Sequence, residues 1–204
     1  MTDSPEPGPC DVTDAVVIAA RTDSTALGQL FDHFYPLIFA YTVRRLLERA
    51  VAEDVTSEVF LKVAVHIPGF SGTRVEDFRR WLFRIATNEI QAHLRQSLRR
   101  RVLLEAAARM RAIPAEIAAP LLSSAASLEW EPLYRALGEL PEREQAIVSL
   151  RFFAGLKHEQ IGEVLDITPG HVRVALNRAL RKLRERLRDR DVPQPPLPGP
   201  WRGK

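Results

Sequence analysis

A helix-start signal followed at once by a long apolar stripe is the feature that most constrains the fold of this chain. Thr168 offers a hydroxyl that can cap a helix, and Pro169 suits the first helical position, where a backbone N–H is not needed. Residues 157–165 (KHEQIGEVL) form a second short helical pattern just upstream, so the two segments together predict a helix-turn-helix. The stripe itself recurs with a period of about 3.5 residues, which indicates one buried helix face, and consists of Val172, Leu176, Ala179, Leu183 and Leu187.

The side of the predicted second helix that faces away from this stripe is basic. Residues 173–190 contain eight Arg or Lys residues against two acids, Glu185 and Asp189. A second basic cluster, Arg95 with residues 99–101, lies far away in the sequence. Two separated basic segments suit two contacts with a polyanion such as DNA. Charge alone leaves a second interpretation open, in which both segments are solvated helix faces.

Composition narrows the class of protein. A chain of 204 residues, 46% hydrophobic and 27% charged, can hold one or two globular domains, and its net charge of +3 is mildly basic. The single cysteine, Cys10, excludes an internal disulfide and a cysteine-based metal site. The five histidines show no metal-ligand spacing, and no phosphate-binding loop or nucleophile motif is recognisable, so we expect no cofactor, no metal and no enzymatic activity. Neither a signal peptide nor an apolar run of about 20 residues is recognisable, which predicts a cytoplasmic protein without membrane insertion.

Helical patterns separated by turn signals predict an all-α chain of two small domains joined by a flexible linker. Residues 1–23 are expected to be a flexible tail, in which an apolar patch at 15–20 docks onto the first domain or forms a short helix. Pro36 is expected to interrupt or kink the first long helix. The predicted ranges are 24–101 for the first domain, 102–128 for the linker, 129–190 for the helix-turn-helix domain and 191–204 for a Pro-rich tail.

The segment from Val75 to Arg99 predicts a long amphipathic helix. Its apolar face, which includes Phe78, Trp81 and Leu82, should point into the core. A solvated face is one interpretation of the other side. The alternative is a row of long donors that hold phosphates and touch base edges, formed by Arg80, Arg84, Asn88, Gln91 and Arg95.

Three segments carry a resemblance to a known family: AEDVTSEVFLKV at 52–63, FRRWLFRIATNEIQAHLR at 78–95, and the run from LGELPEREQ to RKLRERL at 137–187. In this order they resemble the sigma factors of bacterial RNA polymerase, in the small extracytoplasmic-function (ECF) group of the sigma-70 family. The chain departs from the family pattern at three places. Ser57 stands where Gln is usual, Gln91 stands near a usual Asp, and Val174–Ala175 replaces a usual Ser-Arg pair.

The resemblance implies a protein that binds core RNA polymerase, directs it to promoters and helps to open the DNA duplex. The second domain would bind the promoter −35 element through Lys157, Thr168, His171, Arg173, Val174, Asn177, Arg178 and Arg181. The first domain would recognise the −10 element through Phe70, Arg80, Arg84, Asn88, Gln91 and Arg95. Core polymerase would contact Glu53, Asp54, Glu58 and Lys62. An anti-sigma factor is a common partner in this family, and the free chain is expected to be a monomer.

Phe70 and Val174 each have two competing interpretations, whereas Trp81 has one. Phe70 either anchors the loop at 66–77 or stacks on a base that has left the duplex. Val174 either packs within its domain or touches a thymine methyl group. Trp81 is predicted to be a core residue because it lies on the apolar stripe.

The main alternative for the whole chain is a free-standing helix-turn-helix regulator. Such a regulator would bind duplex DNA by itself as a dimer, whereas a sigma factor should be a monomer with little affinity for duplex DNA in the absence of polymerase. Regulators of this kind usually carry a sensor domain or a dimerisation helix, and here the basic row of residues 80–95 stands in its place. An interaction protein that works through the Pro-rich tail is a third interpretation.

Overall fold

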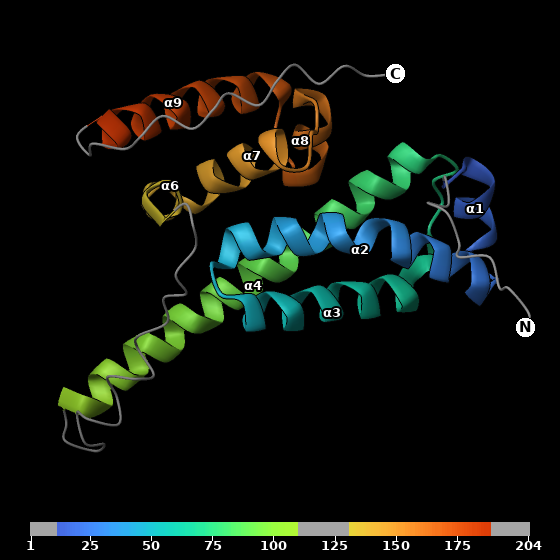
Figure 1. The fold of residues 1–204 in the computed structure, drawn as a ribbon, viewed down its shortest axis with the longest axis horizontal. Helices are drawn as coiled ribbons and strands as arrows, with labels where there is room; N and C mark the ends of the chain where they lie inside the picture. The colour runs from blue at the N-terminus through green and yellow to red at the C-terminus, as the bar shows by residue number, and fades with distance from the viewer. Residues whose placement is uncertain (1–11, 110–130, 189–204) are drawn as a thin grey trace, which may run out of the picture.

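The computed structural model describes residues 12–109 and 131–188, and within these ranges the long elements are all helices (Figure 1). The predicted all-α, two-domain architecture is therefore confirmed. The first domain contains α1 (Asp14–Ala19), α2 (Ser24–Leu46), α3 (Arg49–His66), the short 3-10 helix η1 (Ile67–Gly69) and α4 (Val75–Arg109). The second contains α6 (Glu131–Gly138), α7 (Glu142–Phe152), α8 (His158–Leu165) and α9 (Pro169–Arg188).

Parts of the predicted organisation lie outside these ranges, namely residues 110–128 of the linker and the Pro-rich tail at 191–204. Among the helices that the structure describes, none combines the length and the apolar character that a membrane crossing requires.

Helix α2 begins where the Asp23 carboxylate accepts a hydrogen bond from the Thr25 backbone N–H at 2.8 Å. The helix then continues through Pro36 to Leu46, so the expected interruption at Pro36 does not occur. Phe34 and Ile38, which flank the proline, are both buried. Packing on both sides of Pro36 holds the helix together where its local preference would end it.

The core of the first domain lies between α2, α3 and α4, and its residues recur at helical spacing on the facing side of each helix. Helix α4 continues past its predicted end near Arg99 to Arg109, and Figure 1 shows it extending beyond the rest of the first domain. The buried side chains include Leu30, Phe34, Ile38, Tyr41, Val55, Val59, Phe60, Val63, Phe78, Leu82, Phe83, Ala86 and Ile90.

Helix α1 lies inside the segment that was expected to be a flexible tail. Its Val17 is fully buried, and Ala20, just after the helix, is almost fully buried. Residues 12–23 therefore belong structurally to the first domain, and the apolar patch both forms a helix and docks.

The second domain builds its core from one face of each of its helices. The turn between α8 and α9 depends on Gly162, because a Cβ there would lie 2.6 Å from the Ile167 carbonyl oxygen. Asp166 adopts a left-handed conformation with φ of 54°, and Ile167 N–H donates to the Gly162 carbonyl at 2.9 Å. Thr168 accepts a hydrogen bond from His171 N–H at 3.3 Å, as its predicted capping role requires.

The two domains pack against each other, α7 beside α2 and α8 beside α4 (Figure 1). Three arginines of the first domain contact residues of the second domain. Arg45 donates to the Gln145 amide oxygen at 2.9 Å, the Arg44 guanidinium lies 4.6 Å from the centre of the Phe153 ring, and Arg79 donates to the Ala154 carbonyl oxygen.

Candidate nucleic-acid interface

The exposed face of α9 carries the residues predicted for the −35 element. All eight of these residues, including Lys157 at the start of α8, are exposed. Val174 is 53% exposed, so part of its side chain is available to a partner. Arg181 lies 4.0 Å from Glu185 at a highly exposed position, a contact too weak to hold its guanidinium in place. This face therefore offers donors of two kinds, guanidinium and amide, around one exposed apolar group.

The row predicted for the −10 element lies along α4 as expected. Arg84, Asn88 and Arg95 are exposed, and Arg80 and Gln91 are half-buried. The row thus starts in the body of the protein and continues along one side of the helix toward Arg95.

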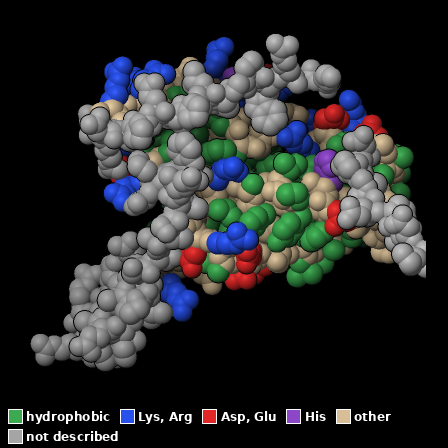
Figure 2. Space-filling model, viewed as in Figure 1, with side chains coloured by type: hydrophobic (Ala, Val, Ile, Leu, Met, Phe, Trp, Pro, Cys, Tyr) green, Lys and Arg blue, Asp and Glu red, His purple; other side chains and the backbone are tan. Residues whose placement is uncertain are grey.

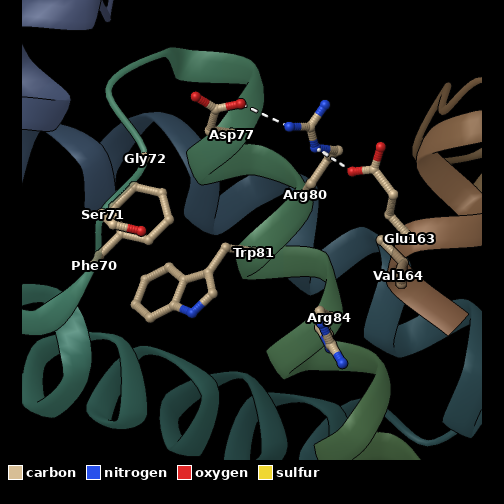
Figure 3. A pocket seen from close by; sticks show the side chains of 9 residues that line it. All are labelled: Phe70, Ser71, Gly72, Asp77, Arg80, Trp81, Arg84, Glu163 and Val164. Atoms are coloured by element: carbon tan, nitrogen blue, oxygen red, sulfur yellow. Dashed lines mark hydrogen bonds and ion pairs between the residues drawn. The ribbon is translucent and has the colours of Figure 1, made fainter. Parts of the chain in front are cut away.

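A cavity of about 290 Å³ opens at the N-terminal end of this row. Phe70 and Trp81 stack on each other in its wall, with ring centres 4.8 Å apart and ring planes inclined by 30° (Figure 3). Phe70 also contacts the buried ring of Phe78 edge-on, at 6.0 Å. The lining residues are Phe70, Ser71, Gly72, Asp77, Arg80, Trp81, Arg84, Glu163 and Val164.

Trp81 packs against the core, as predicted, but lies at its edge. It is half-buried and lines the cavity, whereas Phe78, Leu82 and Phe83 fill the core. The apolar stripe of α4 is wider than the core beneath it, and Trp81 lies at the margin of that stripe. Phe70 contacts Phe78 and Trp81, as its predicted anchoring role requires, and it also lines the cavity, so stacking on a base stays a prediction.

Gly72 and Glu163 line the cavity although the sequence did not single them out. A Cβ on Gly72 would lie 2.4 Å from the Phe70 ring and 2.7 Å from Asp77 Cβ, so the loop packs against both residues only with glycine there. No sequence pattern could have identified Glu163, because it comes from α8 of the other domain.

Arg80 binds carboxylates from both domains. Its guanidinium lies 2.6 Å from Asp77 on its own helix and 2.9 Å from Glu163 across the cavity (Figure 3). The carboxylates of Asp77 and Glu163 pair with guanidinium N–H groups of Arg80 that could otherwise donate to a phosphate or a base. The cavity is thus bordered on one side by the helix-turn-helix domain.

The residues predicted to contact polymerase lie along α3 but are not equally available. Asp54 and Glu58 are exposed, Glu53 pairs with Arg49 at 3.0 Å, and Lys62 pairs with Glu89 of α4 at 2.6 Å. Figure 2 shows hydrophobic side chains gathered over α2 and α3. Large exposed hydrophobic side chains of these two helices are Phe31, Leu37, Leu61 and Val65.

Within the two described ranges, His, Cys, Asp and Glu residues do not gather into a cluster that could hold a metal ion. The groups with a clear pKa shift lie in the core and the domain contact. Burial lowers the pKa of Arg45 and of Arg79, and burial raises the pKa of Tyr41, whose hydroxyl shares a hydrogen bond with Thr87 at 2.9 Å.

Comparison with known proteins relates both domains to one family. Residues 30–101 match the family model of sigma-70 region 2, and residues 136–185 match that of sigma-70 region 4. The chain is 31% identical over 178 residues to the ECF RNA polymerase sigma factor BldN of Streptomyces coelicolor, an alignment that covers 84% of this chain and 64% of BldN. It is also 31% identical over 176 residues to the ECF RNA polymerase sigma factor ShbA of Streptomyces griseus, covering 81% of this chain and 90% of ShbA.

Two solved structures share the fold. CnrH in complex with the cytosolic domain of CnrY matches with a TM-score of 0.63 at 21% identity, covering 88% of this chain and 98% of that chain. The sigma factor RpoE of Bartonella quintana, in complex with the anti-sigma factor NepR, matches with a TM-score of 0.60 at 19% identity, covering 79% and 96%.

Proposed function

The chain belongs to the ECF RNA polymerase sigma factors of the sigma-70 family, and from that premise we propose how its residues divide the work of promoter recognition. The second domain binds the −35 element as duplex, and the first domain binds the −10 element as an opened strand. The observation that carries the proposal is the pairing of an exposed donor row on α9 with an aromatic-lined cavity at the start of the α4 row.

Helix α9 has the features of a helix that enters the major groove. Arg173 and Arg178 can each donate two hydrogen bonds to guanine, and Asn177 can pair with adenine. Val174 offers an apolar surface to a thymine methyl group. Lys157, Thr168, His171 and Arg181 lie beside these groups, where contacts to phosphates fix the position of the helix on the duplex.

The cavity beside Phe70 receives a base from the non-template strand. A base that leaves the stack loses several kcal/mol of stacking and pairing, and a pocket with aromatic and cationic walls offsets about 1–3 kcal/mol of that loss. Phe70 and Trp81 supply the aromatic surface, and Arg80 and Arg84 supply donors to the base edge or its phosphate. Asn88, Gln91 and Arg95 continue the contact along the strand.

Access to this cavity requires the two domains to separate locally, because Glu163 holds Arg80. The Arg80 side chain is 31% exposed and the Glu163 side chain is 57% exposed, so solvent screens this ion pair. It therefore stabilises the packed arrangement of the domains by only about 0–1 kcal/mol. Packing of the two domains also leaves the buried Nε and Nη2 of Arg45 without a hydrogen-bond partner among the described residues. Unpaired buried donors cost free energy, so they lower the stability of the packed arrangement. The Arg80–Glu163 pair is weak enough for polymerase and promoter DNA to break it.

Core polymerase binds the outer face of α3. Asp54 and Glu58 supply charge, and Leu61 and Val65, both 65% exposed, supply an apolar surface on the same side of the helix. Glu53 and Lys62 contribute only if their present ion pairs are exchanged for ones with the polymerase. The protein acts in the cytoplasm as a monomer without catalytic activity of its own. An anti-sigma factor is a further expected partner, and RpoE, a protein of similar fold, forms a complex with the anti-sigma factor NepR.

Run-off transcription tests this function. Purified core polymerase is incubated with and without the protein on a pool of upstream fragments from its own genome. Discrete start sites that require the protein support the proposal, and alignment of the active fragments yields both promoter elements. Failure to bind core polymerase, together with dimeric binding of duplex DNA by the protein alone, would establish the regulator alternative instead.

A further inference from the structure

The segment that forms one wall of the cavity is held at two points from α1 and the turn after it. The Asp14 carboxylate accepts a hydrogen bond from Val75 N–H at 2.8 Å, at the first residue of α4. Arg21 donates from Nη2 to the Gly72 carbonyl oxygen at 2.5 Å. These partners are 61 and 51 residues away in the sequence, so the contacts are tertiary and not part of a local turn.

The element that supplies these contacts has a fixed position. Val17 is fully buried in the core of the first domain, and Val16 and Ala19 pack against it. The turn after α1 is closed by Asp23 N–H, which donates to the Ala19 carbonyl at 2.9 Å. Asp14 and Arg21 therefore hold the loop at a fixed position relative to the core of the first domain.

The loop in turn sets the shape of the cavity. Phe70 and Asp77 lie so near Gly72 that an added Cβ would be 2.4 Å from the Phe70 ring and 2.7 Å from Asp77 Cβ, so a shift of the Gly72 backbone toward them would displace both. Phe70 presents its ring to Trp81, and Asp77 holds the Arg80 guanidinium at 2.6 Å. A displacement of a few tenths of an ångström at Gly72 would therefore shift both the Phe70 ring and, through Asp77, the Arg80 guanidinium.

We propose that Asp14 and Arg21 are positioning residues that determine which base the cavity beside Phe70 accepts. The inference rests on the proposed function of that cavity and extends it to a segment upstream of residues 30–101, the part matched by sigma-70 region 2. Neither residue lines the cavity. Each acts through the loop backbone, Asp14 at its C-terminal end and Arg21 at its centre.

The test uses the full-length protein in holoenzyme and a promoter that this holoenzyme transcribes. Each −10 position of the promoter is replaced by all four bases, and open-complex formation is measured for the wild type, Asp14→Ala and Arg21→Met. Methionine keeps the unbranched apolar chain of Arg21 and removes only its donor. In both variants we expect the preference for the best base over the worst to fall about threefold to tenfold at one −10 position. Preference within the −35 element should stay unchanged.

Conservative and matched variants separate positioning from general stability. Asp14→Asn retains an acceptor for Val75 N–H, and Arg21→Lys retains a donor for the Gly72 carbonyl, so both should restore the base preference. Asp23→Ala removes a capping bond of the same length, 2.8 Å, at the start of α2 and should leave the preference unchanged. If Asp14→Ala does not fold, Arg21→Met with its lysine rescue decides alone.

The outcomes distinguish this inference from the function on which it rests. If the wild type discriminates between bases and the Asp14 and Arg21 variants discriminate equally well, the inference is wrong while the cavity keeps its proposed role. If Asp23→Ala changes the preference as much as they do, α1 only stabilises the domain and the inference is again overturned. If the wild type shows no base preference at any −10 position, the proposed cavity function fails, and the inference fails with it.

Discussion

At the scale of single residues, the loop beside the cavity is governed by the space around Gly72. Its neighbours, Phe70 and Asp77, leave no room for a Cβ, although nothing in the sequence distinguishes this glycine from Gly69 or Gly28. The need for glycine arises from tertiary packing, which a local pattern does not contain. The sequence therefore predicted the loop and Phe70, but not the residue that fixes their relation.

Gly72→Ala should destabilise the protein by about 1–3 kcal/mol, because the Phe70 ring and the Asp77 backbone must move to admit the methyl group. The free energy of unfolding in urea measures this effect. Gly28→Ala is the matched control, since nothing lies within 4 Å of its added Cβ in the interior of α2. That change should stabilise the protein by about 0.5–1 kcal/mol, and equal effects of both substitutions would contradict the packing argument.

A second prediction at this scale concerns Arg173 on α9. Arg173→Ala should cost about 1–3 kcal/mol of discrimination at one base pair of the −35 element, because a bidentate contact to guanine is lost. Holoenzyme binding to a set of single-base −35 variants measures it. Arg143→Ala, which removes an exposed arginine from α7, is the control. A uniform loss over all promoters would show that Arg173 contacts only phosphate.

At the scale of elements, helical periodicity predicted most of the structure. The predicted stripes correctly identified Phe78 and Leu82 of α4 as buried, and Thr168 with Pro169 marked the start of α9. On α9 the stripe residues that are buried are Val172, Leu176, Ala179 and Leu183. Local pattern left three features undecided: how far Pro36 disturbs α2, whether α4 continues into residues 102–109, and whether the apolar patch at 15–20 forms a helix, docks or does both. For α2 and α1 the missing information is the packing of one helix on another, which overrides local preference.

The outer face of α3 gives the element-scale prediction. Leu61→Asp should weaken binding to core polymerase about tenfold, because a charge would replace an apolar contact at the interface. Titration of labelled protein with core polymerase provides the dissociation constant. Leu98→Asp is matched in exposure, 62% against 65% for Leu61, and lies on α4 instead. Comparable weakening by the two variants would count against a polymerase contact on α3.

At the scale of the whole molecule, the main feature is that the two proposed DNA-binding sites differ in accessibility. The α9 face is exposed, whereas the cavity is bordered by Glu163 and Val164 of the helix-turn-helix domain. The sequence named Phe70, Arg80 and Arg84 of the cavity lining, but it did not indicate Gly72, Glu163 or the mutual arrangement of the two sites. The pairing of Arg80 with Glu163 depends on how two separately patterned domains meet.

Glu163→Gln should shift the free protein toward a separated arrangement of its domains, because it removes one of the two carboxylates on Arg80. The effect on the ratio of separated to packed molecules should be about twofold to fivefold, as expected for an exposed ion pair. Energy transfer between dyes on the two domains reports this ratio. Glu159→Gln, an exposed acid one turn earlier on α8, should leave it unchanged. An unchanged ratio for Glu163→Gln would show that the arginine contacts near α7 hold the domains together alone.

The central claim is that the cavity lined by Phe70, Trp81 and Arg80 receives a base of the opened −10 strand. The most direct measurement places a photocrosslinking base at each −10 position of the non-template strand in the holoenzyme complex and maps the crosslinked peptide. One position should crosslink to residues 70–84, and its yield should fall when Phe70 is replaced by alanine. Crosslinks from the non-template strand that lie only outside this segment would contradict the claim.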